Sequence, residues 1–261
     1  MTAVFRAAGV QVSFGGVRAV AGVDLEIEPG ELVGLIGPNG AGKTTFIDAV
    51  SGFVKYTGTV ELGGAPLDGL RPHARAQRGL ARTWQTVELF DDLTVRENLT
   101  VAARNGSASV DAELELLGLK SAADAMPWEL SQAERKRAGV GRALVARPRL
   151  LCLDEPAAGL DVRQSKEFGE LLPGIAKNGT AILLVDHDMG LVLSVCDRVV
   201  VLDAGNVIAQ GTPAQIRGDE KVIAAYLGHA AGSSENNSSP ESTDSSGSTG
   251  SLGNTGTAGA V

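Results

Sequence analysis

Short apolar runs alternate with segments of helical periodicity along much of this chain. The runs at residues 32–36, 150–153 and 181–185 contain no charged position, and helical patterns at 162–176 and 188–195 follow the last two. A strand without polar positions is typically buried on both faces, as in a parallel sheet that helices cover on each side. The pattern therefore predicts an α/β fold.

β-rich sequence lies toward both ends of this core pattern. Residues 4–14 and 19–27 read as strands, and 57–62 is a short strand closed by a pair of glycines. Residues 198–202 and 206–209 flank a turn and predict a hairpin. We therefore expect an antiparallel β-rich part near the N-terminus of the α/β core.

The middle of the chain has helical character. Residues 71–78 predict a short helix, and 94–119 carry apolar positions at helical spacing. Ser131 is a candidate N-cap for a helix that runs to 145. Residues 214–227 predict a further helix. We expect residues of about 86–145 to form a smaller helical subdomain within a folded unit that spans 1–228.

The composition changes sharply after Leu227. Ser, Gly, Thr and Asn dominate residues 229–261, and that stretch contains no aromatic residue, Lys or Arg. Such a segment buries too little apolar area to offset the entropy lost on ordering. We predict that it is a disordered tail.

Composition and charge limit the possible functions. The chain has 261 residues, of which 43% are hydrophobic, so a sizeable core is expected. The net charge of −8, from 23 basic and 31 acidic residues, argues against a general nucleic-acid surface. The absence of a long apolar run and of a signal segment predicts a soluble intracellular protein, and its two cysteines are expected to be buried thiols.

A glycine-rich segment joins the apolar run at 32–36 to a helical pattern. Its sequence, Gly37-Pro-Asn-Gly-Ala-Gly-Lys-Thr-Thr45, fits the phosphate-binding pattern G-x-x-x-x-G-K-[ST]. Glycines allow backbone N–H groups to face a phosphate, and the following helix offers its positive end to the same anion. The candidate nucleotide-binding residues are Gly37, Pro38, Asn39, Gly40, Ala41, Gly42, Lys43, Thr44 and Thr45.

Two members of this segment have specific roles in that interpretation. Lys43 supplies a point charge for the outer phosphates, and Thr44 offers its hydroxyl to Mg²⁺. ATP and Mg²⁺ are therefore the expected ligands. The alternative is a Gly/Lys turn before a helix that arose by chance, which the flanking strand and helix patterns disfavour.

Two carboxylates follow the apolar run at 150–153. Asp154 and Glu155 would lie at the carboxyl end of a buried strand, where open α/β sheets place their ligands. We expect Asp154 to hold Mg²⁺ together with Thr44, and Glu155 to act as the general base toward the attacking water. The alternative is a strand end capped by solvated acids.

With these motifs in this order, residues 4–228 resemble the ATP-binding subunits of ABC transporters. The resemblance implies a P-loop NTPase core of the ABC ATPase type, with an antiparallel β subdomain and a helical subdomain. Phe14 matches the aromatic residue that stacks on adenine, although it could instead be a core or edge-strand residue. Gln85 matches the glutamine that reaches Mg²⁺ and water, and His187 matches the histidine that contacts the γ-phosphate. Asp161 lies in the segment that matches the loop crossing the dimer interface.

The signature of this family is altered here. It usually reads Leu-Ser-Gly-Gly-Gln, whereas this chain has Leu130-Ser-Gln-Ala-Glu134. In the family, Ser131 would contact ATP held by a second ABC ATPase subunit, like or unlike this one. Ala133 adds a methyl group and Glu134 adds negative charge near that anion. Two interpretations stay open: the chain supports its partner's site weakly, or the substitutions are tolerated.

Softer similarities indicate the branch of the family. Ser13-Phe-Gly-Gly16, Asp186-His-Asp-Met189 and Ala225-Tyr-Leu-Gly228 resemble the subunits that energise branched-chain amino acid import. Importers of urea and related amides, and lipopolysaccharide-export ATPases, carry similar phrases. The resemblance implies separate permease subunits, an indirect solute-binding protein, no nucleic acid, and a peripheral position on the cytoplasmic face of the membrane.

Two other functions are compatible with the sequence. A regulatory subunit would bind ATP and hydrolyse it weakly, which the altered signature favours and the pair Asp154-Glu155 opposes. A non-transport ABC ATPase would act on DNA or ribosomes. The single cassette, the acidic balance and the lack of sustained heptads disfavour that second function.

Overall fold

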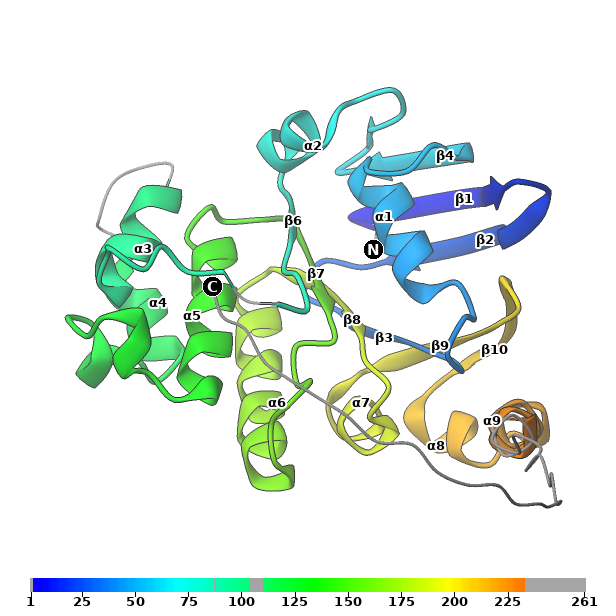
Figure 1. The fold of residues 1–261 in the computed structure, drawn as a ribbon. Coiled ribbons are helices and arrows are strands. Elements are labelled where there is room, and N and C mark those ends of the chain that lie inside the picture. Colours follow the sequence, from blue (N-terminus) through cyan, green and yellow to red (C-terminus); the bar gives the residue numbers. More distant parts are fainter. Residues whose placement is uncertain (1, 87, 104–109, 233–261) are drawn as a thin grey trace, which may run out of the picture.

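The computed structural model describes residues 2–86, 88–103 and 110–232 and contains two sheets with helices packed around them (Figure 1). The larger sheet has six strands in the order β10-β9-β3-β8-β7-β6. All neighbouring strands in it are parallel except the hairpin pair β9 and β10. Its strands are β3 (Leu32–Ile36), β6 (Leu80–Arg82), β7 (Leu150–Asp154), β8 (Ala181–Val185), β9 (Arg198–Asp203) and β10 (Asn206–Gly211).

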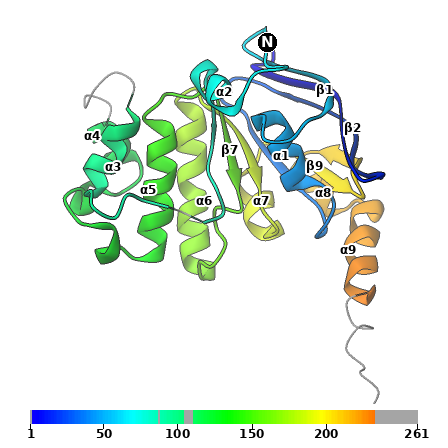
Figure 2. The same ribbon diagram turned by 45° about the horizontal axis from the view of Figure 1, so that its top comes forward.

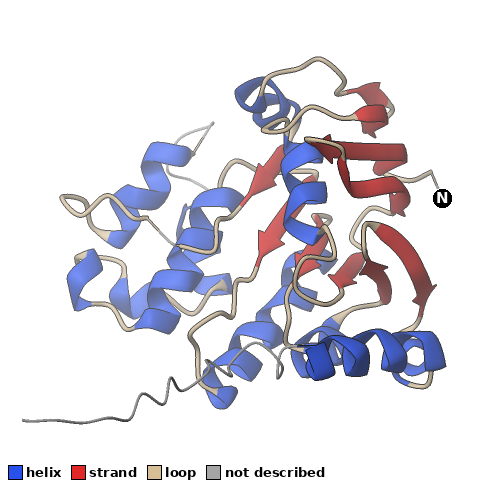
Figure 3. Ribbon diagram, turned by 45° about the vertical axis from the view of Figure 1, so that its right-hand side comes forward, coloured by secondary structure: helices blue, strands red, loops and turns tan. Residues whose placement is uncertain are grey.

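The smaller sheet is antiparallel and has the order β2-β1-β4-β5. Its strands are β1 (Phe5–Phe14), β2 (Val17–Ile27), β4 (Thr57–Leu62) and β5 (Ala65–Pro66). This sheet is the antiparallel part that the N-terminal sequence predicts. Figure 3 shows its strands at the upper right of the view, beside helix α1.

The larger sheet separates two apolar cores, and side chains of one strand alternate between them. Leu151 and Leu153 of β7 belong to the core that contains most helices, whereas Leu150 and Cys152 belong to the core shared with the antiparallel sheet. Both faces of β7 are therefore buried, and burial on both faces explains why an apolar run such as 150–153 contains no polar position. Both cysteines are buried and free, as expected.

The helices lie between the two sheets and around them. Helix α1 (Lys43–Ser51) lies between the two sheets, and its side chains Phe46 and Ile47 are fully buried there. Figure 2 shows a layer that contains α3, α4 and α5, next to α6 and α7. Besides α1, the α-helices among the described residues are α2 (Pro72–Arg78), α3 (Val95–Ala102), α4 (Val110–Leu116), α5 (Gln132–Leu144), α6 (Val162–Lys177), α7 (Met189–Val195), α8 (Pro213–Arg217) and α9 (Glu220–Gly232).

Two stretches with helical patterns each contain two helices, and in the second of them a single predicted helix is divided. The helical pattern at 94–119 contains α3 and α4, and the pattern at 214–227 contains α8 and α9. Gly218 is the C-cap of α8, and the carboxylate of Asp219 accepts hydrogen bonds from the amides of Lys221 and Val222, where the next helix starts. A local cap thus overrides an apolar periodicity that runs through both helices.

The C-terminal boundary also differs by a few residues. Helix α9 continues to Gly232, so residues 229–232 are helical although we assigned them to the tail. The remainder of the predicted tail, residues 233–261, lies outside the described residues. Among the residues that are described, no helix is long and apolar enough to cross a membrane.

Candidate nucleotide site

The glycine-rich segment connects the carboxyl end of β3 to the start of α1. Gly42 is the N-cap of this helix and has φ of 101°, a left-handed conformation that suits glycine. A Cβ at this position would lie 2.3 Å from the carbonyl oxygen of Ala19 on β2. No side chain caps the helix, so its first N–H groups stay available to an anion.

Lys43 lies inside this loop rather than in solvent. Its side chain donates hydrogen bonds from Nζ to the carbonyl oxygens of Gly37 at 2.7 Å and Pro38 at 2.9 Å. Burial lowers the pKa of Lys43, and the carboxylates of Glu155, Asp154 and Asp186 act in the opposite direction. Asn39, Gly40 and Thr44 are exposed around it, and Thr45 is partly buried.

Asp154 ends β7 and is held by an arginine that the sequence analysis did not select. Arg82 ends the neighbouring strand β6 and donates from Nη2 to Asp154 Oδ2 at 2.9 Å. Its other terminal nitrogen donates to Asp48 Oδ1 on α1. Burial raises the pKa of Asp154, and the hydrogen bond from Arg82 opposes that rise.

Three predicted site residues meet beside Asp154. Gln85 donates from Nε2 to Glu155 Oε2 at 2.8 Å, and His187 Nδ1 lies 3.6 Å from the same oxygen. They come from the ends of β6, β7 and β8, which are adjacent and parallel. Glu155 has φ of 46°, an unusual conformation for a residue other than glycine and one that occurs often at functional sites.

Two further charged residues surround this group, and the sequence analysis missed both. Asp186 is 1% exposed and accepts hydrogen bonds from the amides of Asp188 and Ala157. It directly follows the apolar run 181–185, as Asp154 follows its own run, and that parallel could have identified it. Lys136 of α5 is buried and donates from Nζ to the carbonyl oxygen of Gln85 at 2.8 Å.

The altered signature forms a closed hydrogen-bonded unit. Ser131 caps α5 as predicted and accepts a hydrogen bond from the amide of Glu134. The carboxylate of Glu134 in turn accepts from the Ser131 hydroxyl at 2.6 Å and from its amide at 2.9 Å. These hydrogen bonds lower the pKa of Glu134, so the negative charge is held at the start of the helix.

Asp161 starts a helix and Phe14 ends a strand, and neither lies in the glycine-rich loop. Asp161 is the N-cap of α6 and accepts from the amide of Gln164 at 2.8 Å. Phe14 is 53% exposed at the end of β1, in the hairpin with β2. That hairpin is tied to the glycine-rich loop through Gly205, which accepts from the amide of Ala21 and donates to the carbonyl oxygen of Ala41.

The oxygen groups at this edge of the sheet suit a magnesium ion. Thr44 presents a hydroxyl, Asp154 a carboxylate and Gln85 an amide oxygen, and Mg²⁺ prefers such hard oxygen ligands. Arg82 bonds Oδ2 of Asp154. The residues present therefore fit the ion that the sequence analysis expects.

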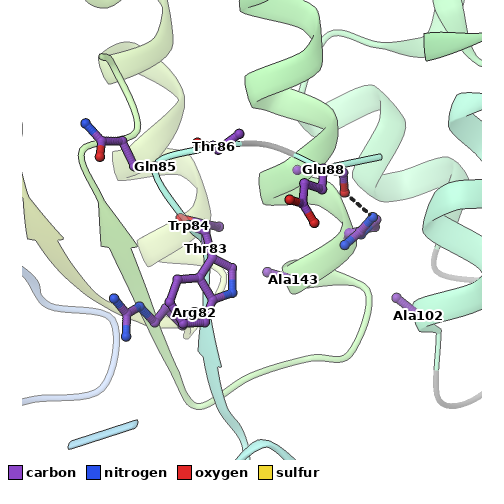
Figure 4. Close-up of a pocket in the computed structure, with 10 residues that line it drawn as sticks. Arg82, Thr83, Trp84, Gln85, Thr86, Glu88, Ala102 and Ala143 are labelled. Carbon is purple, nitrogen blue, oxygen red and sulfur yellow. Dashed lines mark hydrogen bonds between the residues drawn. The ribbon is translucent and has the colours of Figure 1, made fainter. Parts of the chain in front are cut away.

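A groove opens beside Gln85, between the end of β6 and helices α3 and α5 (Figure 4). Its volume is about 660 Å³, and a second hollow of about 340 Å³ shares Arg82, Trp84 and Arg142 with it. We call the two together the Trp84 groove. The lining residues of the larger hollow are Arg82, Thr83, Trp84, Gln85, Thr86, Glu88, Ala102, Gly139, Arg142 and Ala143.

The fold and this site define a class of protein. A phosphate loop after a central parallel strand, with carboxylates at the ends of neighbouring strands, is the arrangement of a P-loop nucleotide-binding protein. The family model "ABC transporter" matches residues 20–158, more than half of the chain. The chain belongs to the ABC transporter family, as an ATPase that drives transport.

Curated relatives extend this likeness over most of the chain. The high-affinity branched-chain amino acid transport ATP-binding protein LivG of Escherichia coli K12 is 41% identical over 246 residues, covering 85% of this chain and 96% of LivG. The lipopolysaccharide export system ATP-binding protein LptB of the same organism is 34% identical, covering 87% and 98%. A second family model, "Branched-chain amino acid ATP-binding cassette transporter", matches residues 206–232.

A solved structure shows the same fold. The ADP conformation of MJ1267, an ATP-binding cassette of an ABC transporter, superposes with a TM-score of 0.80 at 27% identity, covering 87% of this chain and all of that one. The predicted fold class, a P-loop NTPase core of the ABC ATPase type, is thereby confirmed. The predicted resemblance to the branched-chain importer group is confirmed by the relatives.

Proposed function

We propose that this chain hydrolyses Mg·ATP to energise the import of branched-chain amino acids or related small amides through separate permease subunits. The likeness to LivG and the family match over α8, α9 and β10 support the solute class. The proposed hydrolysis is supported by one observation above all: Gln85 and His187 both contact Glu155, close to the loop in which Lys43 is buried.

Each residue of the group has a role in this proposal. The open N–H groups at the start of α1 and the charge of Lys43 bind the phosphates, and Thr45 and the loop residues 37–42 complete the cradle. Glu155 orients and deprotonates the attacking water, and His187 contacts the γ-phosphate. Gln85 holds Glu155 before nucleotide arrives, because its amide donates to the carboxylate.

The proposed magnesium site consists of Thr44 and Asp154, with Gln85 completing it. Bound there, Mg²⁺ would neutralise negative charge on the phosphates. Asp154 needs a fixed orientation to serve as a ligand, and the hydrogen bond from Arg82 gives it one.

The proposed partners are a second ABC ATPase subunit and permease subunits. Phe14 would stack on adenine within this chain, whereas Ser131 and Asp161 would face the second subunit. The Trp84 groove is the surface we propose for the permease, because it exposes Trp84 next to Gln85. We propose that the chain lies on the cytoplasmic face of the membrane, with residues of about 86–145 as the helical subdomain of a unit that spans 1–228.

An uptake experiment tests the solute. The gene is deleted in the source organism, and uptake of radiolabelled leucine, isoleucine, valine and urea is compared with the parent strain. We expect loss of branched-chain uptake, rescue by the unaltered gene and no rescue by Glu155→Gln. Normal uptake of all three branched-chain amino acids in the deletion strain would reject the solute assignment.

A further inference from the structure

The side chain of Arg82 connects strand β7 to helix α1. Its side chain is 5% exposed, and its two terminal nitrogens donate to Asp154 on β7 and Asp48 on α1. The carboxylate partners are 7% and 27% exposed. The arginine thus joins the proposed magnesium carboxylate to the helix that follows the phosphate loop.

The flat face of the same guanidinium lies against aromatic rings. Its central carbon is 4.1 Å from the centroid of the Trp84 ring and 5.9 Å from that of Phe53. The two rings also contact each other edge to face, with centroids 5.0 Å apart. A cation over an aromatic face is attracted by the ring, and the attraction increases when water is excluded.

Both rings reach the surface. Trp84 is 49% exposed and Phe53 is 53% exposed, and both line the Trp84 groove. Figure 4 shows Arg82, Trp84 and Gln85 on one continuous segment at the edge of this groove. Arg82 therefore bonds Asp154 at one end and packs its face against two side chains that are each about half exposed.

Stability alone does not explain this arrangement. A buried ion pair is often no better for folding than an apolar cluster of similar volume, because both charges lose their hydration. Arginine does offer a rigid fork that fixes two carboxylates and a flat face that stacks on a ring at the same time. The geometry therefore favours a role in which Arg82 couples the position of Trp84 to the orientation of Asp154.

We propose that Arg82 is a positioning residue. It links the magnesium carboxylate Asp154 to the aromatic wall of the Trp84 groove, which consists of Trp84 and Phe53. A shift of Trp84 moves the guanidinium, and the guanidinium moves or releases Asp154. By thermodynamic linkage, contact at the wall and magnesium binding then change each other's affinity by the same factor. This inference rests on the proposed magnesium site.

The first test measures how much Mg²⁺ strengthens ADP binding, by calorimetry with and without EDTA. In Arg82→Gln we expect ADP affinity in EDTA to stay within about twofold, and the enhancement by Mg²⁺ to fall roughly 10- to 100-fold, as for lost hydrogen-bond partners of metal ligands. Arg82→Lys keeps the charge without the fork and should lie between. Arg198→Gln removes a partly buried arginine paired with Glu31 at the other end of the sheet, and should leave the enhancement unchanged.

A second measurement keeps Arg82 intact, in case its variants do not fold. The chain has two tryptophans, so Trp128→Phe leaves Trp84 as the only indole reporter. We expect Trp84 emission to change when Mg²⁺ is added to the ADP complex, and this step to disappear in the Asp154→Asn background. Trp84 emission that ignores Mg²⁺ would overturn the link.

The outcomes separate this inference from the proposed function. If the unaltered chain shows no enhancement of ADP binding by Mg²⁺, the proposed magnesium site is wrong and the inference falls with it. If the unaltered chain shows the enhancement and Arg82→Gln retains all of it, only the link through Arg82 is wrong.

Discussion

Two helix N-termini of this molecule differ in how their first N–H groups are satisfied. Helix α1 starts at Gly42 without a side-chain cap, and Lys43 follows at once. Helix α5 starts at Ser131, which forms a reciprocal capping box with Glu134. The first end is open and cationic, whereas the second is closed and carries a carboxylate.

This difference has a functional meaning within the proposed family mechanism. An anion gains from free N–H groups and positive charge at a helix start, and loses near a carboxylate. The chain therefore suits ATP at its own loop better than ATP presented by a second subunit to its signature. We propose that it hydrolyses ATP at its own site and supports its partner's site weakly.

Loss of the proposed general base, Glu155, should have the largest effect on hydrolysis of the ATP that is bound at the open end of α1. Glu155→Gln should reduce turnover in the assembled complex by roughly 100-fold or more, the usual contribution of general base catalysis. Nucleotide binding should remain, because Lys43 and the loop are unchanged. Phosphate release and ADP calorimetry on the same preparation measure both. Substantial hydrolysis in this variant would remove Glu155 from the mechanism.

The loop lysine should have the next largest effect. Lys43→Ala removes the buried charge that bonds the carbonyl oxygens of Gly37 and Pro38, and should weaken ATP binding by about 10- to 100-fold, as for lost hydrogen bonds to charged groups. Titration with ATP in EDTA isolates this effect from magnesium. An affinity equal to that of the unaltered chain would contradict the assignment of the phosphate loop.

The closed end can be tested by removing its charge while keeping its cap. Glu134→Gln retains an acceptor for the Ser131 amide, and should raise turnover at the partner's site roughly two- to fivefold, the size of a surface charge effect. Glu170→Gln on α6, an exposed residue paired with Lys166, is the matched control. No rise beyond that control would favour the other interpretation, that the altered signature is tolerated.

The smallest effect concerns stability. Ser131→Ala removes the acceptor for the Glu134 amide, and should cost about 1 kcal/mol of free energy of unfolding, typical of a lost N-cap. In a chain of this size that corresponds to a fall in melting temperature of about 2–4 °C. Thermal unfolding followed by circular dichroism measures it. An unchanged melting temperature would show that the capping box does not stabilise α5.

The sequence predicted correctly those strands and helix starts whose ends are set by residues a few positions away. The strands at 32–36 and 181–185 agree with the structure, and Ser131 is the N-cap that its sequence indicates. The helix predicted at 214–227 is divided into α8 and α9, because apolar periodicity does not show where a local cap divides a helix. The boundary between α8 and α9 follows from the hydrogen bonds of Asp219, which periodicity does not reveal.

The sequence could identify a residue of the candidate site where that residue directly follows an apolar strand. Asp154 and Glu155 have that position, and so does Asp186, which the same reasoning should have included. Arg82 and Lys136 gave no such signal. A lone arginine after an extended segment and a lysine within a helix are ordinary surface residues until the fold buries them.

The sequence by itself determined the phosphate loop, the strands that precede the acids and the cap of α5, because these depend on residues a few positions apart. Only the tertiary structure decided that Arg82 bonds Asp154, 72 positions away, and that Lys136 bonds the carbonyl oxygen of Gln85, 51 positions away. Such pairs form because adjacent parallel strands end at one edge and a helix packs over it. Strand order and packing are properties of the whole chain, and no short window of sequence contains them.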